Sequence, residues 1–164
     1  MPLKKEVIQK YMNNVFVESG SLVGGAIETA LSVGFKKVLS VELAEKYYNI
    51  CKNKFDNDPR VTLFFGDVEL LLWDMIKDIK EPITFWLDGH ESGGDTAKGI
   101  HGDPMTQELE IIKLHPIKTH TILIDDVRGN PDPNLFKLLK DINNKYNFIM
   151  EDGYVVNDVL VAQI

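Results

Sequence analysis

The chain lacks the sequence signals of several large protein classes. It has one cysteine, Cys51, so no disulfide can form within the chain, and we interpret this residue as a buried reduced thiol. No apolar run approaches the roughly 20 residues that span a membrane. The first residues, Met1–Glu6, also lack the apolar core of a signal peptide. We therefore expect a cytoplasmic protein without a membrane partner.

Positive charge is scarce. The chain has 18 Lys and Arg against 25 Asp and Glu, which gives a formal net charge of −7, and the basic residues are scattered along the sequence. Proteins that grip the phosphate backbone need clustered basic residues. We therefore expect no nucleic-acid partner.

What the chain does have is an ordinary globular composition. Of its 164 residues, 44% are hydrophobic and 26% are charged, which is enough apolar surface to bury a core. No linker or internal repeat divides the sequence. We predict one domain over residues 1–164.

Short apolar runs typical of β-strands alternate with longer segments of helical period. The runs are Val15–Val17, Lys37–Val41, Val61–Phe65, Ile83–Leu87 and Thr121–Ile124. The helical segments are Lys4–Tyr11, Gly24–Val33, Ala44–Phe55, Val68–Ile79, Met105–Leu114 and Asn134–Asn143. This alternation predicts a three-layer, Rossmann-like α/β sandwich with a mainly parallel sheet.

The C-terminal segment breaks the alternation. The apolar runs Tyr146–Met150 and Val159–Ile164 lie too close together for a crossover helix. They therefore predict an antiparallel hairpin at the end of the sheet.

Acidic residues follow or end every predicted parallel strand, where open α/β sheets bind ligands. They are Glu18, Glu42, Asp67, Asp88 and the pair Asp125–Asp126. The acids at one rim indicate a site for a cationic ligand, a metal ion, or both.

The turn after the first strand reads Glu18-Ser19-Gly20-Ser21-Leu22-Val23-Gly24-Gly25. Its glycines allow a close approach of backbone to ligand, but the G-x-G-x-x-G spacing of dinucleotide-binding proteins is absent. Glu18 would repel a pyrophosphate and suits a ligand with an ammonium and a sulfonium, such as S-adenosylmethionine. A plain strand-to-helix turn is the alternative.

Two further acids fit the same nucleoside. Glu42 can accept hydrogen bonds from ribose hydroxyls, a feature that dehydrogenases share. Asp67 can lie near the adenine amino group or cap the following helix, and the sequence favours neither.

Asp88, Asp125 and Asp126 end neighbouring strands, so their charges would repel one another unless a cation were bound. Oxygen ligands favour Mg²⁺, Mn²⁺ or Ca²⁺, of which we expect Mg²⁺. In the alternative, one acid points away and another caps a loop.

Together these motifs, with Trp86-Leu87-Asp88-Gly89 and Ile124-Asp125-Asp126, resemble class I S-adenosylmethionine-dependent methyltransferases over Val15–Arg128. The chain is most similar to the metal-dependent macrocin O-methyltransferase group and to small bacterial or viral relatives that share the segment Leu87–Thr96. The resemblance implies O-methylation of a small molecule or sugar. Larger members carry an N-terminal cap that this sequence lacks, and a second copy in a homo-oligomer is one way to complete the acceptor site.

The resemblance also implies roles for individual residues. Glu18, Gly20, Ser21, Gly24 and Gly25 would hold the methionine part of the cofactor. Glu42 would bind its ribose and Asp67 would lie near its adenine. Asp88, Asp125 and Asp126 would hold the divalent cation, so Asp88 also enters the catalytic set.

His90, two residues beyond Asp88, is the candidate general base, because a neutral imidazole can take the acceptor's proton. Glu91 is a rival, and His90 can instead hold an aspartate in place. His101 lies in a glycine-rich segment, Gly93–Thr96 and Gly99–Gly102, that we interpret as a lid. We interpret His115 and His120 as structural.

Two other functions share these features. The chain can be a cofactor-binding or interaction module without methyl transfer. It can also be a nicotinamide-dependent oxidoreductase, although the missing glycine fingerprint and the terminal hairpin disfavour that reading.

Overall fold

The computed structural model describes residues 3–88, 99–100 and 103–164. Its elements are α1 (Lys5–Ile8), a 3-10 turn (Gln9–Tyr11), β1 (Val15–Ser19), α2 (Gly25–Val33), β2 (Lys37–Glu42), α3 (Glu45–Phe55), β3 (Val61–Phe65), α4 (Val68–Ile76), β4 (Ile83–Leu87), α5 (Met105–Leu114), β5 (Thr121–Ile124), α6 (Pro133–Ile142), β6 (Asn147–Glu151) and β7 (Val159–Gln163).

The strands form one seven-stranded sheet in the order β3-β2-β1-β4-β5-β7-β6. The first five strands pair in parallel, and β7 runs antiparallel to both β5 and β6. The predicted sandwich and the terminal hairpin are therefore confirmed. The insertion of β7 between β5 and β6 goes beyond the prediction.

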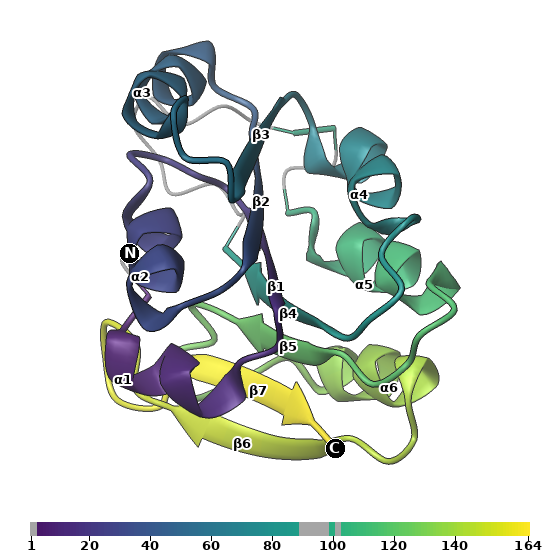
Figure 1. Cartoon of the computed structure of the whole chain (residues 1–164). Coiled ribbons are helices and arrows are strands. Elements are labelled where there is room, and N and C mark those ends of the chain that lie inside the picture. Colours follow the sequence, from purple (N-terminus) through teal and green to yellow (C-terminus); the bar gives the residue numbers. More distant parts are fainter. Residues whose placement is uncertain (1–2, 89–98, 101–102) are drawn as a thin grey trace.

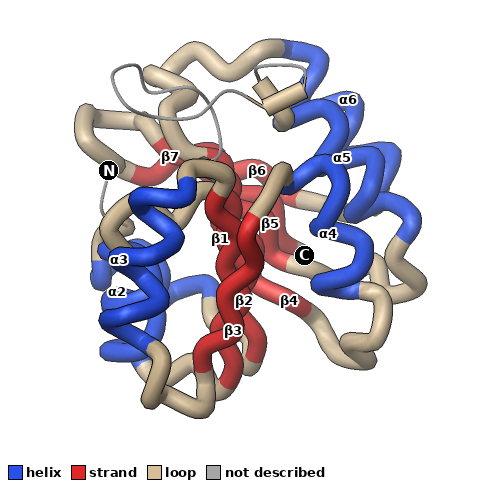
Figure 2. The backbone as a smooth tube through the Cα atoms, turned by 90° about the horizontal axis from the view of Figure 1, so that it is seen from above, coloured by secondary structure: helices blue, strands red, loops and turns tan. Residues whose placement is uncertain are grey.

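Helices cover both faces of the sheet (Figure 1). Helices α2 and α3 lie on one face, with α1 packed beside α2, and α4, α5 and α6 lie on the other, as the view from above also shows (Figure 2). Because successive side chains of a strand point to opposite faces, Phe16 enters the core under α2 while Val15 and Val17 enter the core under α4–α6. No helix in the described ranges is long and apolar enough to cross a membrane.

Several element ends differ from the prediction. Parallel pairing continues to Ser19 on β1, so Glu18 lies within that strand rather than after it, whereas Glu42 ends β2 as expected. Helix α4 ends at Ile76 instead of Ile79, because the Ile79 N–H bonds to the Ile76 carbonyl in a turn.

A buried histidine pair joins the amino ends of β4 and β5 to α4. His120 Nδ1 accepts a hydrogen bond from the Ile83 N–H at 3.1 Å, so its Nε2 carries the proton and donates to His115 Nδ1 at 3.1 Å. His115 Nε2 then donates to the Ile76 carbonyl at 3.1 Å. Burial lowers the pKa of His120 to about 3, with the His115 charge acting in the same direction, so His120 stays neutral. The structural interpretation of both histidines is confirmed.

Candidate functional site

The candidate site lies where the strand order reverses. From β1 the chain adds β2 and β3 on one side, then returns to add β4 and β5 on the other. The carboxyl ends of β1 and β4 therefore flank the crevice in which open α/β sheets bind ligands. Glu18 is the fourth residue of β1, and Asp88 directly follows β4.

The register of the strands brings two of the predicted acids to one face. Phe16, Val38, Trp86 and Leu123 all point into the core on the α1–α3 side. Glu18 and Glu42 each stand an even number of positions further along the same strands, and strand alternation turns them to the same side. Glu18 and Glu42 therefore share one surface, which the cofactor prediction requires. Asp88 and Asp125 directly follow β4 and β5, and the charge of Asp88 acts on both Glu18 and Asp125.

Glu18 is the most deeply buried acid of this face, with 2% of its surface exposed. The Ser40 hydroxyl donates to its carboxylate at 2.5 Å, and the Ser21 hydroxyl lies 2.6 Å from that of Ser40. Burial raises the pKa of Glu18 to about 8, and the charges of Asp88 and Glu42 act in the same direction against the Ser40 hydrogen bond. A positively charged ligand would restore the ionised form.

Glu42 braces the turn after β1. Its two carboxylate oxygens accept hydrogen bonds from the backbone N–H groups of Leu22 and Ala44, each at 2.8 Å. Each oxygen retains a lone pair, so the carboxylate can still accept from two ribose hydroxyls.

The backbone conformation and the close packing of the turn after β1 explain its glycines. Gly20 and Gly24 have φ of 84° and 81°, a region that disfavours residues with a Cβ. A Cβ on Gly24 would lie 2.5 Å from the Phe55 ring. Gly24 caps α2, and Gly25 begins that helix. Their contact with a cofactor stays a prediction.

Asp67 caps helix α4 through the Glu69 N–H at 2.9 Å. Its second oxygen accepts the Ile100 N–H at 3.0 Å. The capping alternative is therefore confirmed, and a role for Asp67 beside the adenine stays a prediction.

An acidic cluster lies at the end of β5. Asp125, Asp126 and Asp158 each place one carboxylate oxygen within 4.8 Å of the others. Burial raises the pKa of Asp125 to about 7, with the charges of Asp88 and Asp126 adding to this effect. Asp88 thus influences both Glu18 and Asp125, although it is not in the group of three.

Arg128 neutralises part of this cluster. Its guanidinium lies 2.5 Å from Asp126 and 3.7 Å from Asp158. Asp158 is fully buried and also accepts backbone hydrogen bonds from Arg128, Tyr154 and Val155. The donor set is hard oxygen and fits Mg²⁺, but a metal ion would compete with Arg128 for it.

Several candidates lie outside the described residues. They are His90, its rival Glu91, His101 and most of the glycine-rich segment, including Gly93–Thr96. Of the segment, Gly99 and Ile100 are described, and both lie against Asp67.

Sequence reasoning missed three residues of this region. Ser40 was readable as the one hydroxyl residue in its apolar strand, β2. Asp158 precedes β7 and lies far along the chain from its cluster. Glu108, on α5, is fully buried, and burial raises its pKa to about 7 against the effect of a side-chain hydrogen bond from Ser19.

No family model matches the sequence. A search of curated proteins likewise finds no match. Solved structures do match.

Three methyltransferases illustrate the match. The O-methyltransferase from Bacillus cereus in complex with S-adenosylhomocysteine is 17% identical, with a TM-score of 0.62 over 98% of this chain and 78% of that one. TomG from Streptomyces achromogenes, involved in tomaymycin synthesis and bound to S-adenosylmethionine, is 11% identical, with a TM-score of 0.61 over 98% and 77%. CalS11, a TDP-rhamnose 3'-O-methyltransferase of calicheamicin biosynthesis, is 12% identical, with a TM-score of 0.64 over 93% and 72%.

The chain has the fold of these methyltransferases. At this level of identity the likeness concerns architecture alone. Membership of the macrocin group stays a prediction.

Proposed function

We propose that the chain is an S-adenosylmethionine-dependent methyltransferase that acts on a hydroxyl of a small molecule or sugar with the help of a divalent cation. The observation that carries the proposal is Glu18: a carboxyl group 2% exposed, at the strand-order reversal of a methyltransferase fold. Its burial beside Glu42 and Asp88 favours a cationic ligand.

Each residue then has a definite task. Glu18 accepts a hydrogen bond from the ammonium of the methionine part, and Glu42 accepts from the ribose. Asp88, Asp125 and Asp126 would hold the cation, which would lower the pKa of the acceptor hydroxyl when bound. The methyl group comes from S-adenosylmethionine. Mg²⁺, a cytoplasmic location and a homo-oligomer stay predictions.

Isothermal calorimetry with S-adenosylhomocysteine tests the cofactor assignment. We expect Glu18→Gln to weaken binding at least about tenfold, because a charge-assisted hydrogen bond contributes about 1.5–3 kcal/mol. Glu28→Gln is the control, since Glu28 is an exposed acid on the adjacent helix α2, and it should bind like the wild type. Binding of NAD without binding of S-adenosylhomocysteine would reverse the assignment in favour of an oxidoreductase.

Methyl transfer is tested separately with labelled S-adenosylmethionine and a panel of alcohols and sugars, with Mg²⁺ or with a chelator. We expect product in the presence of metal only. Cofactor binding without product from any acceptor would instead indicate a binding module.

A further inference from the structure

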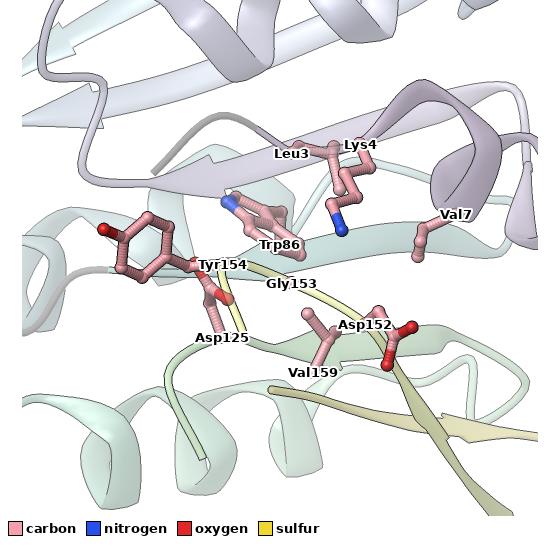
Figure 3. Close-up of a pocket in the computed structure, with 9 residues that line it drawn as sticks. All are labelled: Leu3, Lys4, Val7, Trp86, Asp125, Asp152, Gly153, Tyr154 and Val159. Carbon is pink, nitrogen blue, oxygen red and sulfur yellow. The ribbon is translucent and has the colours of Figure 1, made fainter. Parts of the chain in front are cut away.

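A small pocket opens beside Asp125, on the face that carries Glu18. Leu3 and Val7 line it from the N-terminal segment and α1, Trp86 from β4, Val159 from β7, and Tyr154 from the turn before β7 (Figure 3). Its accessible volume of about 10 Å³ is close to that needed for one water molecule or one hydroxyl group.

Trp86, which lines the pocket, carries a buried hydrogen-bond donor that lacks an acceptor in the described part of the chain. Trp86 is 2% exposed, and its indole Nε1 has no hydrogen-bond partner among the residues in the described ranges. The indole N–H can only donate, and an unsatisfied buried donor is destabilising. An oxygen atom of a ligand would satisfy it.

A hydrogen-bond acceptor, Asp125, lines the same pocket. Asp125 presents a carboxyl group, which accepts from a hydroxyl donor. One hydroxyl can accept from Trp86 and donate to Asp125 at once, whereas an ammonium or an ether can do only one of these.

The rest of the lining combines the apolar side chains of Leu3, Val7 and Val159 with Lys4 and Asp152, and Tyr154 extends it outward. Tyr154 is 68% exposed, and its backbone N–H donates to the buried Asp158 carboxylate at 3.0 Å. An exposed aromatic side chain beside the pocket suits an apolar carbon body attached to the bound hydroxyl.

We propose that this pocket binds the acceptor alcohol through a hydroxyl that accepts from Trp86 Nε1 and donates to Asp125, with the acceptor's apolar body against Tyr154. The role as acceptor site rests on the proposed methyltransferase function. The binding itself does not, so it is measured without cofactor or metal.

Nuclear magnetic resonance gives a direct readout, because the chain has two tryptophans and hence two indole N–H signals. Trp73→Phe assigns them. Phenol is the probe, as a hydroxyl on an apolar ring, and glycerol is the comparison. We expect phenol to move the Trp86 signal downfield and saturably while the signal of Trp73, which is 39% exposed on α4, stays in place.

A pair of variants tests Tyr154. Tyr154→Ser should raise the phenol Kd at least threefold, whereas Val156→Ser should not, since Val156 is 72% exposed on the same turn but does not line the pocket.

Three results would overturn the proposal: a Trp86 signal that phenol leaves unmoved, parallel shifts of both indole signals, or glycerol binding as tightly as phenol. Equal effects of the two turn variants would remove Tyr154 from it. Failure of S-adenosylhomocysteine to bind would instead count against the methyltransferase function and leave this result standing.

Discussion

The two ends of the sheet bury ionisable groups in opposite ways. At the amino ends of β4 and β5, each ring nitrogen of His115 and His120 has a hydrogen-bond partner, and burial holds His120 neutral. At the carboxyl ends, burial raises the pKa values of Glu18, Asp125 and Glu108 to between about 7 and about 8. The histidine network has all its hydrogen bonds and needs no ligand. At the carboxyl ends, burial favours the protonated acids, and a bound cation would favour their ionised form. We infer that the amino end serves the fold and the carboxyl end serves a ligand.

The largest effect is expected from a substitution at the amino ends of β4 and β5. His120→Ala would leave the Ile83 N–H and His115 Nδ1 without a side-chain partner, so we expect the free energy of unfolding to fall by about 3 kcal/mol. Urea denaturation measures the change. His120→Asn keeps an acceptor near the Nδ1 position and should lose less. A folded His120→Ala protein that binds S-adenosylhomocysteine more weakly than the wild type would contradict the division between the two ends.

The next largest effect is expected at the carboxyl end, in the pH dependence of cofactor affinity. Glu18 must lose its proton to bind an ammonium, and its pKa is raised to about 8, so affinity should rise from pH 6 to pH 8 and then level. The expected gain is about 50-fold, with release of one proton. Calorimetry in buffers of different ionisation enthalpy measures both quantities. In Glu18→Gln the profile should flatten, and an unchanged slope in that variant would assign the titration to another group.

Glu108 tests whether buried carboxyl groups at this end cost stability. A raised pKa means that the folded state keeps a proton that the unfolded state loses, so stability falls as the pH rises from about 4.5 to about 7. Glu108→Gln should therefore be more stable than the wild type by about 1–3 kcal/mol at pH 8, with no gain at pH 4.5. Glu110→Gln, a half-exposed acid on the same helix, is the control. A destabilised Glu108→Gln at pH 8 would indicate that the ionised carboxylate is bound.

The His120 contribution has the opposite sign. Its folded pKa is lowered to about 3, so the unfolded state binds the additional proton, and stability falls as the pH drops below about 6.5. Between about pH 4.5 and pH 6.5 the contributions of Glu108 and His120 oppose each other, so the pH series of the Glu108→Gln and His120→Ala variants are compared with that of the wild type to separate them.

Sequence periodicity was enough to predict the sheet, because buried parallel strands are continuously apolar and their helices recur at 3.6 residues. The pairing of β4 with β5 was predicted, but the order of the two C-terminal strands in the sheet was not. Yet the runs that form β6 and β7 differ: Asn147–Glu151 carries polar ends and is half exposed, while Val159–Ala162 is wholly apolar and buried. That difference identifies β6 as the edge strand.

The sequence predicted those parts of the candidate site that depend only on a residue's position along a strand. Glu18 and Glu42 share a face because strand geometry requires it, and Asp88 and Asp125 follow the ends of neighbouring strands. Contacts made through loops were not predictable: Asp158 reaches Asp126 from the far end of the chain, and Arg128 approaches both through a turn with φ of 51°. No local sequence pattern specifies these contacts between distant segments.

The smallest effect is expected from replacing Arg128, and this substitution tests whether the acidic cluster binds a metal ion. Its guanidinium already pairs with Asp126 and Asp158, so it acts as the cation that the cluster would otherwise bind. Arg128→Gln should raise the affinity for Mn²⁺, a paramagnetic substitute for Mg²⁺, by about threefold, since an exposed or partly exposed ion pair contributes about 0.2–1 kcal/mol. Electron paramagnetic resonance measures the free ion. Asp125→Asn in the Arg128→Gln background should remove that binding, because the site loses a negatively charged ligand. If neither the wild type nor Arg128→Gln takes up Mn²⁺, the cluster is an arginine-bridged clasp between β5 and β7, and the carboxyl end of the sheet binds only the nucleoside.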